Sequence, residues 1–239
     1  MKHTKKVLFA ILVPCLIAPT ANASVIQISN ASGSFNLQSH TMDLFSGTSP
    51  DFSTYDLAEV HNILNSWGIT TDGKITILPV DTVQGFSFLT LIDREFGGGD
   101  NGNDASLGIT STASNALGMV INDVGQDSWQ LIQPPFGSQT LGATFVWGGV
   151  DSGDGFAWTD LVYGDAVSYS FTDLDGDGGA IDAEGFQFVG WDDIEGWGIV
   201  STNEFNVDGT SMFTGLVIPG PPTALLLTSL LLCTPRRRR

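Results

Sequence analysis

The chain has 239 residues and a formal net charge of −17, with 26 acidic residues against nine basic ones. Seven of the nine basic residues lie at the two ends, so the part between them carries 26 acids against Lys74 and Arg94 alone, a formal charge of −24. Because affinity for phosphate rests on Lys and Arg, this composition excludes nucleic acid and anionic lipid as partners of the central part.

The acidity has two interpretations that the sequence leaves open. It is either an adaptation to saline surroundings, where a Debye length of about 3 Å near 1 M salt screens self-repulsion, or a sign of specific cation binding. Cys15 and Cys233 lie at the two ends, so residues 24–217 cannot form a disulfide or a cysteine-ligated metal site. Residues 24–217 are long enough to bury a sizeable core as a single domain.

Residues 1–23 have the pattern of a secretory signal peptide. Three lysines precede the apolar run Val7–Ala18, and Ala21-Asn22-Ala23 provides a small-residue cleavage site. We therefore expect cleavage after Ala23 and export of the remaining chain.

One segment near the N-terminus has helical periodicity, and most of the rest has the pattern of strands. Asp56 suits a helix N-cap with Glu59 three residues on, apolar residues keep helical spacing as far as Trp67, and Gly68 suits the C-terminal stop. His61 on this helix is interpreted as a structural residue rather than a base. Short runs bounded by Gly, Asn and Asp predict strands at 25–29, 34–38, 75–80, 82–92, 107–112, 118–122, 129–133, 140–147, 156–162, 166–172, 186–191, 198–202 and 211–217.

The strand pattern indicates an all-β fold. Period-two alternation in Phe86-Ser87-Phe88, in residues 167–171 and in Phe186-Gln187-Phe188 places aromatic rings on one face of each strand. Many short strands with a single helix favour an antiparallel β-sandwich of jelly-roll type. We expect residues 24–217 to form this one domain.

Residues 173–184 match the calcium loop of EF-hand type. Acids at loop positions 1, 3, 5 and 12 with Gly at position 6 reproduce the D-x-D-x-D-G-x5-E pattern, because closely spaced carboxylates supply the hard oxygens that Ca²⁺ prefers. The segment before the loop has the pattern of a strand, so we expect a lone site with an affinity on the order of 10⁻⁴ to 10⁻³ M. An acidic turn without a bound ion is the alternative. The predicted ligands are Asp173, Asp175, Asp177, Gly179 through its carbonyl, and Glu184.

Catalytic motifs are absent from the sequence, and we predict no enzymatic activity. There is no G-x-S-x-G, no H-E-x-x-H and no P-loop, and the glycine-rich stretch 97–104 is interpreted as an acidic loop because no helix pattern follows it. A carboxylate pair for glycoside hydrolysis could be drawn from Glu184, Asp192, Asp193 and Glu195, but acids are so abundant that this carries little weight.

Tryptophans beside carboxylates provide an alternative function. Trp191 and Trp197 enclose the acids Asp192, Asp193 and Glu195, and Trp158 lies near Asp160. A tryptophan ring stacks on the C–H face of a sugar while carboxylates accept hydrogen bonds from its hydroxyls. These tryptophans are therefore either core residues or the sugar-binding residues of a lectin-like module.

Residues 218–239 form a three-part C-terminal tail. A proline-rich break is followed by the apolar run Ala224–Cys233, of roughly 15 Å as a helix against a hydrocarbon core of about 30 Å, and then by a terminal basic cluster. The tail resembles the PEP-CTERM sorting signal, with Pro-Gly-Pro where the family usually has Pro-Glu-Pro. The residues that carry the resemblance are Pro219, Pro221, Arg236, Arg237, Arg238 and Arg239.

The resemblance implies that an exosortase recognises the tail and that the protein reaches the cell surface or the extracellular matrix. A plain C-terminal membrane anchor is the alternative, and in either case membrane contact is expected only through this segment. We predict an exported, non-catalytic structural or adhesive protein stabilised by Ca²⁺, with extracellular polysaccharide as a partner. A carbohydrate-binding module is the second hypothesis.

Overall fold

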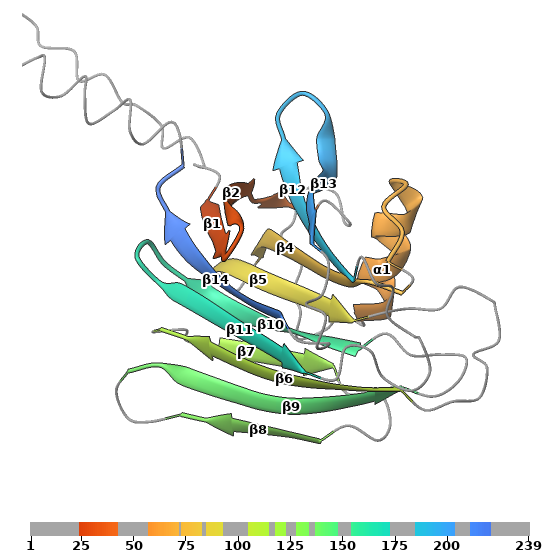
Figure 1. Cartoon of the computed structure of the whole chain (residues 1–239). Coiled ribbons are helices and arrows are strands. Elements are labelled where there is room, and N and C mark those ends of the chain that lie inside the picture. The colour runs from red at the N-terminus through yellow and green to blue at the C-terminus, as the bar shows by residue number, and fades with distance from the viewer. Residues whose placement is uncertain are drawn as a thin grey trace, which may run out of the picture.

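The computed structural model describes residues 24–42, 57–71, 73–82, 85–92, 105–114, 118–122, 128–133, 137–147, 154–172, 185–203 and 211–220. Four predicted features lie outside these residues: the signal peptide 1–23, the glycine-rich stretch 97–104, the calcium loop 173–184 and the tail beyond Gly220. The described part is mostly β, with one helix and two sheets of seven strands each (Figure 1).

Sheet A is antiparallel throughout, and its first and last strands in the chain lie side by side. Val25 pairs with Ile218, so the chain enters and leaves the described part at the same end of this sheet. In spatial order the strands are β2 (Gly33–Gln38), β1 (Val25–Asn30), β14 (Ser211–Ile218), β11 (Ala166–Thr172), β6 (Ala105–Ala113), β9 (Gln139–Trp147) and β8 (Ser128–Ile132).

Sheet B is mixed, which corrects the expectation of a wholly antiparallel fold. Strand β4 (Ile75–Thr82) has parallel partners in β12 (Phe186–Asp192) and in the short β3 (His40–Thr41). β3 and β4 run parallel because the connection between them, which contains the helix, carries the chain back before β4 begins. In spatial order the strands of sheet B other than β3 are β13 (Gly196–Asn203), β12, β4, β5 (Gly85–Ile92), β10 (Asp154–Leu161) and β7 (Gly118–Asn122).

The alternation in the strands sorts their side chains as predicted. Phe86 and Phe88 on β5 and Phe186 and Phe188 on β12 are buried, and so are Val167, Tyr169 and Phe171 on β11. Rings from both sheets meet in one core: the Tyr169 ring lies 4.5 Å from that of Phe213 on β14 and 5.8 Å from that of Phe88. The two sheets are therefore held together by a largely aromatic layer.

Helix α1 (Leu57–Ser66) forms where the periodicity predicted a helix, and it covers the other face of sheet B. Val60 and Leu64 are fully buried against apolar residues of β4, β5 and β12, and burial of each is worth about 1.5–3 kcal/mol. The helix ends before Gly68, whose φ of 80° favours glycine. His61 is also fully buried, and its Nδ1 lies 2.7 Å from the hydroxyl of Thr71, which agrees with a structural role.

A buried hydroxyl joins the polar atoms of the core. The Ser111 Oγ on β6 accepts a hydrogen bond of 2.8 Å from the indole N–H of Trp158 and donates to the carbonyl oxygen of Ser168 at 3.1 Å. The hydroxyl of Tyr169 accepts a hydrogen bond from Thr90. These contacts satisfy polar groups that would otherwise be costly inside an aromatic core.

Strand registers place every connection at one of two ends of the sheets. We call the end that holds Val25, Ile218 and the turn between β12 and β13 the tail end, because the C-terminal tail starts there. The opposite end, which we call the loop end, holds the first residue of β14, the last residue of β11 and the first residue of β12. The segments 93–104, 148–153, 173–184 and 204–210 all join strands at the loop end.

Replacing Ser111 with alanine should destabilise the domain. The indole N–H of Trp158 would remain buried without its acceptor, at a cost of about 1–3 kcal/mol in the free energy of unfolding. Thr110→Ala, one residue away on the exposed side of the same strand, is the matched control and should change the free energy by less than about 0.5 kcal/mol. Urea unfolding measures both, and equal effects of the two substitutions would contradict the buried hydrogen bond.

Candidate functional site

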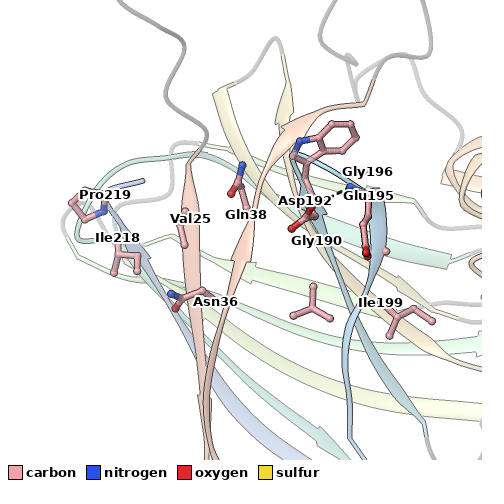
Figure 2. A pocket seen from close by; sticks show the side chains of 13 residues that line it. Val25, Asn36, Gln38, Gly190, Asp192, Glu195, Gly196, Ile199, Ile218 and Pro219 are labelled. Atoms are coloured by element: carbon pink, nitrogen blue, oxygen red, sulfur yellow. Dashed lines mark hydrogen bonds between the residues drawn. The ribbon is translucent and has the colours of Figure 1, made fainter. Parts of the chain in front are cut away.

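A groove of about 470 Å³ lies at the tail end, between the β12–β13 hairpin and the paired strands β1, β2 and β14. Figure 2 shows Asn36 and Gln38 of β2 on one side of it and Asp192, Glu195 and Ile199 of the hairpin on the other. Its lining is completed by Val25, Gly190, Trp191, Gly196, Gly198, Val200, Ile218 and Pro219.

The carboxylate of Asp192 shapes the turn of the hairpin. Its Oδ1 accepts hydrogen bonds from the backbone N–H groups of Ile194 at 2.8 Å and Glu195 at 3.0 Å, and these two bonds lower the pKa of Asp192 below its usual range. Gly196 follows with a φ of 84°, a conformation that favours glycine. The turn therefore holds an ionised carboxylate at the rim of the groove.

Glycines make the hairpin side of the groove hollow. A Cβ atom on Gly198 would meet no atom within 4 Å, so the missing side chain leaves open space there. A Cβ on Gly190 would lie 3.1 Å from Val200 and 3.5 Å from Leu37, so this glycine allows β2 to approach β12 closely. The missing side chain of Gly198 therefore contributes open space to the groove, while Gly190 lets its two walls lie close together.

Contacts from three directions fix the ring of Trp191. Its indole N–H donates to Asp193 Oδ1 at 3.2 Å, and the same oxygen accepts a hydrogen bond of 3.3 Å from the Gln38 amide across the groove. His40 stacks on one face of the indole with centroids 4.0 Å apart, and Trp197 lies edge-on at 5.8 Å. Trp191 therefore presents only its uncovered edge and surface to the groove, in a fixed orientation.

The residue that covers Trp191 is itself held near a partly buried carboxylate. His40 begins β3, which pairs with the end of β4 at Asp81. Burial raises the pKa of Asp81, while a hydrogen bond from Ser39 and the nearby His40 oppose this rise. The hydrogen bond from Ser39 to Asp81 helps to hold β3 beside β4 and thereby to position His40 on Trp191.

The three tryptophans proposed as sugar-binding residues have three different environments. Trp158 is fully buried in the core between the sheets, so it has no surface to offer a sugar, and of the two interpretations the core one applies to it. Trp197 stacks on Trp67, the residue after α1, with ring centroids 6.1 Å apart, and it packs against the apolar cluster between α1 and sheet B. Only Trp191 lines the groove.

Two of the groove's polar residues were not predicted from the sequence. Asn36 and Gln38 come from β2, more than 150 positions before the hairpin, and nothing in their local sequence indicates that they face Asp192 and Glu195. The carboxylates of the hairpin were identified as possible hydrogen-bond acceptors beside tryptophan, and Asp192 and Glu195 do lie beside Trp191 in the lining.

The lining limits which ligands can bind. Amides and carboxylates can donate to and accept from hydroxyl groups, while Ile199, Val200 and Ile218 supply apolar contact. Among the described residues, no Lys or Arg lines the groove, so an anionic ligand would face the carboxylates of Asp192 and Glu195 without a neutralising cation from this part of the chain. The groove is suited to an uncharged, hydroxyl-rich ligand the size of a few sugar rings.

Within the described ranges, no group of three or more His, Cys, Asp and Glu side chains could hold a metal ion, and the predicted calcium ligands lie outside these ranges. The helix in this part of the chain is too short and too polar to cross a membrane. No family model, curated protein or solved structure matches the chain.

The geometry of the turn implies an unusually acidic Asp192. Because its pKa is lowered in the folded state, the contribution of Asp192 to stability is present above the pKa of the unfolded chain and is lost as the pH falls through the folded pKa. We expect the amide signals of Ile194 and Glu195 to shift in an NMR titration with a midpoint below 3.8, the ordinary pKa of Asp. Asp192→Ala should remove this transition, and a midpoint at or above 3.8 would contradict the two hydrogen bonds.

Proposed function

We propose that the chain is an exported, non-catalytic protein of the cell surface or extracellular matrix, and that its groove at the tail end binds uncharged carbohydrate. The observation that carries this proposal is the groove itself, with amides on one wall, carboxylates on the other and an orientated tryptophan between them. The leader 1–23 and the PEP-CTERM-like tail support export and recognition by an exosortase-type enzyme.

The strand order supports a β-sandwich of jelly-roll type as the framework for this site. The chain passes from one sheet to the other at β2–β3, β5–β6, β6–β7, β7–β8, β9–β10, β10–β11, β11–β12 and β13–β14, and the first described strand pairs with the last. In such a fold the connections lie at the two ends of the sheets. The sequence of a hairpin that forms one wall of a groove can therefore change without disturbing the core.

Filling the groove should abolish carbohydrate binding without unfolding the protein. Gly198→Leu places a side chain in open space between the two walls, and we expect it to lower affinity for an uncharged polysaccharide at least tenfold. Gly142→Leu is the matched control, because Gly142 also lies in a strand and also faces open space, but on β9, far from the groove in the order of sheet A.

Affinity electrophoresis of the full-length protein through gels that contain dextran, a mixed-linkage glucan or alginate measures this binding. Retardation by an uncharged polymer that Gly198→Leu removes and Gly142→Leu retains supports the proposal. Retardation by alginate alone, or equal loss in both variants, would overturn it.

Calcium at residues 173–184 is proposed as a second feature of the same protein. The topology supports it, because five connections at the loop end, 93–104, 123–127, 148–153, 173–184 and 204–210, together contain 14 of the 26 acidic residues. A divalent cation there would reduce repulsion among them. The loop end is the end of the sheets away from the tail. A cation bound there could also bind an anionic polysaccharide and so join it to the protein.

Calcium should raise the thermal midpoint of the full-length protein. A site at one hundred times its dissociation constant adds about 2.7 kcal/mol, which corresponds to roughly 5–10 °C for a domain of this size. Asp175→Ala with Glu184→Ala should remove the rise, whereas Asp160→Ala at the tail end should leave it unchanged. Scanning calorimetry with calcium or magnesium at matched ionic strength measures the thermal midpoint. Equal effects of the two ions would contradict a specific calcium site and favour an acidic turn without a bound ion.

A further inference from the structure

Strand β8 forms one edge of sheet A, and it lacks the devices that usually protect such an edge. Among the residues that the structure describes, it pairs only with β9 (Figure 1), and it has no irregularity in its register and contains neither a charged residue nor proline. Exposed edges of natural sheets normally carry charges, prolines or bulges, because their free N–H and C=O groups can pair with another strand. This edge is therefore open to pairing.

Strand β8 exposes large apolar side chains to solvent. Trp129 is 47 % exposed and Ile132 is 55 % exposed, although both are large apolar residues. Leu131 packs only partly against the core. A strand added beside β8 would cover all three.

The other edge of sheet A is protected. Strand β2 approaches β12 so closely that the backbone N of Gln38 lies within 3.6 Å of the Cβ position of Gly190, and the β12–β13 hairpin lies beside it. Sheet A therefore has one covered edge and one open edge, which permits a closed pair of molecules rather than an endless sheet.

Charge favours a second copy of this chain as the occupant. None of the seven strands of sheet A contains a charged residue, although the chain outside its two ends has a formal charge of −24. Two copies that meet at β8 bring uncharged strands together and leave the acidic connections at the ends of the sheets. A cationic partner would find no carboxylate on this strand to contact.

We propose that the protein forms a symmetric homodimer through antiparallel pairing of β8 with the β8 of a second copy. The register that pairs all five residues sets Trp129 opposite the partner's Leu131 and Gln130 opposite the partner's Gln130. Trp129 is then buried against an apolar neighbour, as cross-strand pairs in antiparallel sheets require. The seven-stranded sheet becomes a continuous sheet across both molecules.

The dimer would make the protein bivalent. The groove lies beside β2, at the edge of sheet A farthest from β8, so the two grooves would be separated by roughly 60 Å at about 4.8 Å per strand. Antiparallel pairing also turns the two tail ends in opposite directions. Two weak carbohydrate sites would then act together on one polymer or bridge two polymers.

A charge exchange at Gln130 tests the proposal. Gln130 is exposed and faces its own copy across the two-fold axis, so Gln130→Lys and Gln130→Glu should each place like charges opposite one another and raise the dimer dissociation constant at least tenfold. An equimolar mixture of the two variants should restore association, because lysine then faces glutamate. Gln27→Lys, on the outward side of the inner strand β1, is the matched control and should dimerise like the unmodified protein.

Sedimentation velocity of the full-length protein and of these variants over a range of concentrations measures the association. Added NaCl should strengthen the unmodified dimer, because it screens the repulsion between two acidic molecules. A monomer at all concentrations and salt levels overturns the proposal. A dimer that persists in both Gln130 variants also overturns it. A dimer that Gln27→Lys disrupts as strongly as the Gln130 variants do would place the interface on the face of the sheet and overturns it too. Carbohydrate binding by a monomer would leave the proposed function intact, so the two proposals fail separately.

Discussion

The structure depends on the aromatic packing around Tyr169. Its ring stacks on Phe213 and Phe171 within its own sheet and meets Phe88 and Phe156 of the opposite sheet, with centroids between 4.5 and 5.8 Å apart. Residues 24–217 have no cysteine, and only two cations oppose 26 acids, so neither disulfides nor ion pairs can supply much of the stability. Burial of large rings has to exceed both the chain entropy and the charge repulsion.

The same repulsion explains where the charged residues lie. A carboxylate on a strand of sheet A would sit within a strand spacing of its neighbours, whereas one on a connection at the end of the sheets is surrounded by water. The strands of sheet A accordingly contain none, and sheet B has both faces covered, one by the aromatic core and one by α1. Two candidate surfaces for recognition on the described part are then the hairpin at the tail end and the edge at β8.

Local features of the sequence predicted most of the fold. The alternating rings on β5, β11 and β12 face inward as expected, and α1 begins and ends beside its expected cap and glycine. Phe156-Ala157-Trp158 carries the same alternation, which indicates that Trp158 faces inward beside Phe156, whereas the nearby Asp160 kept sugar binding open as an alternative. The pattern of the strand was the better guide, because two rings spaced two residues apart must share a face.

Long-range pairings could not be predicted in this way. The parallel pairing of β4 with β3 depends on where the connection that contains α1 returns the chain, and its parallel pairing with β12 joins segments far apart in the sequence, so no local pattern encodes either. The groove needs Gln38 beside Asp193 and Gly190 beside Leu37, contacts between strands from the two ends of the described chain. The tryptophans and carboxylates of the hairpin gave half of the site, and the amides that complete it came only with the structure.

The pairing of the first strand with the last places the groove and the tail side by side. Ile218 and Pro219 are both residues of the groove wall and the first residues of the proposed sorting signal, and Gly220 is buried against the domain. A polymer bound in the groove would therefore lie next to the point where the tail leaves the folded part.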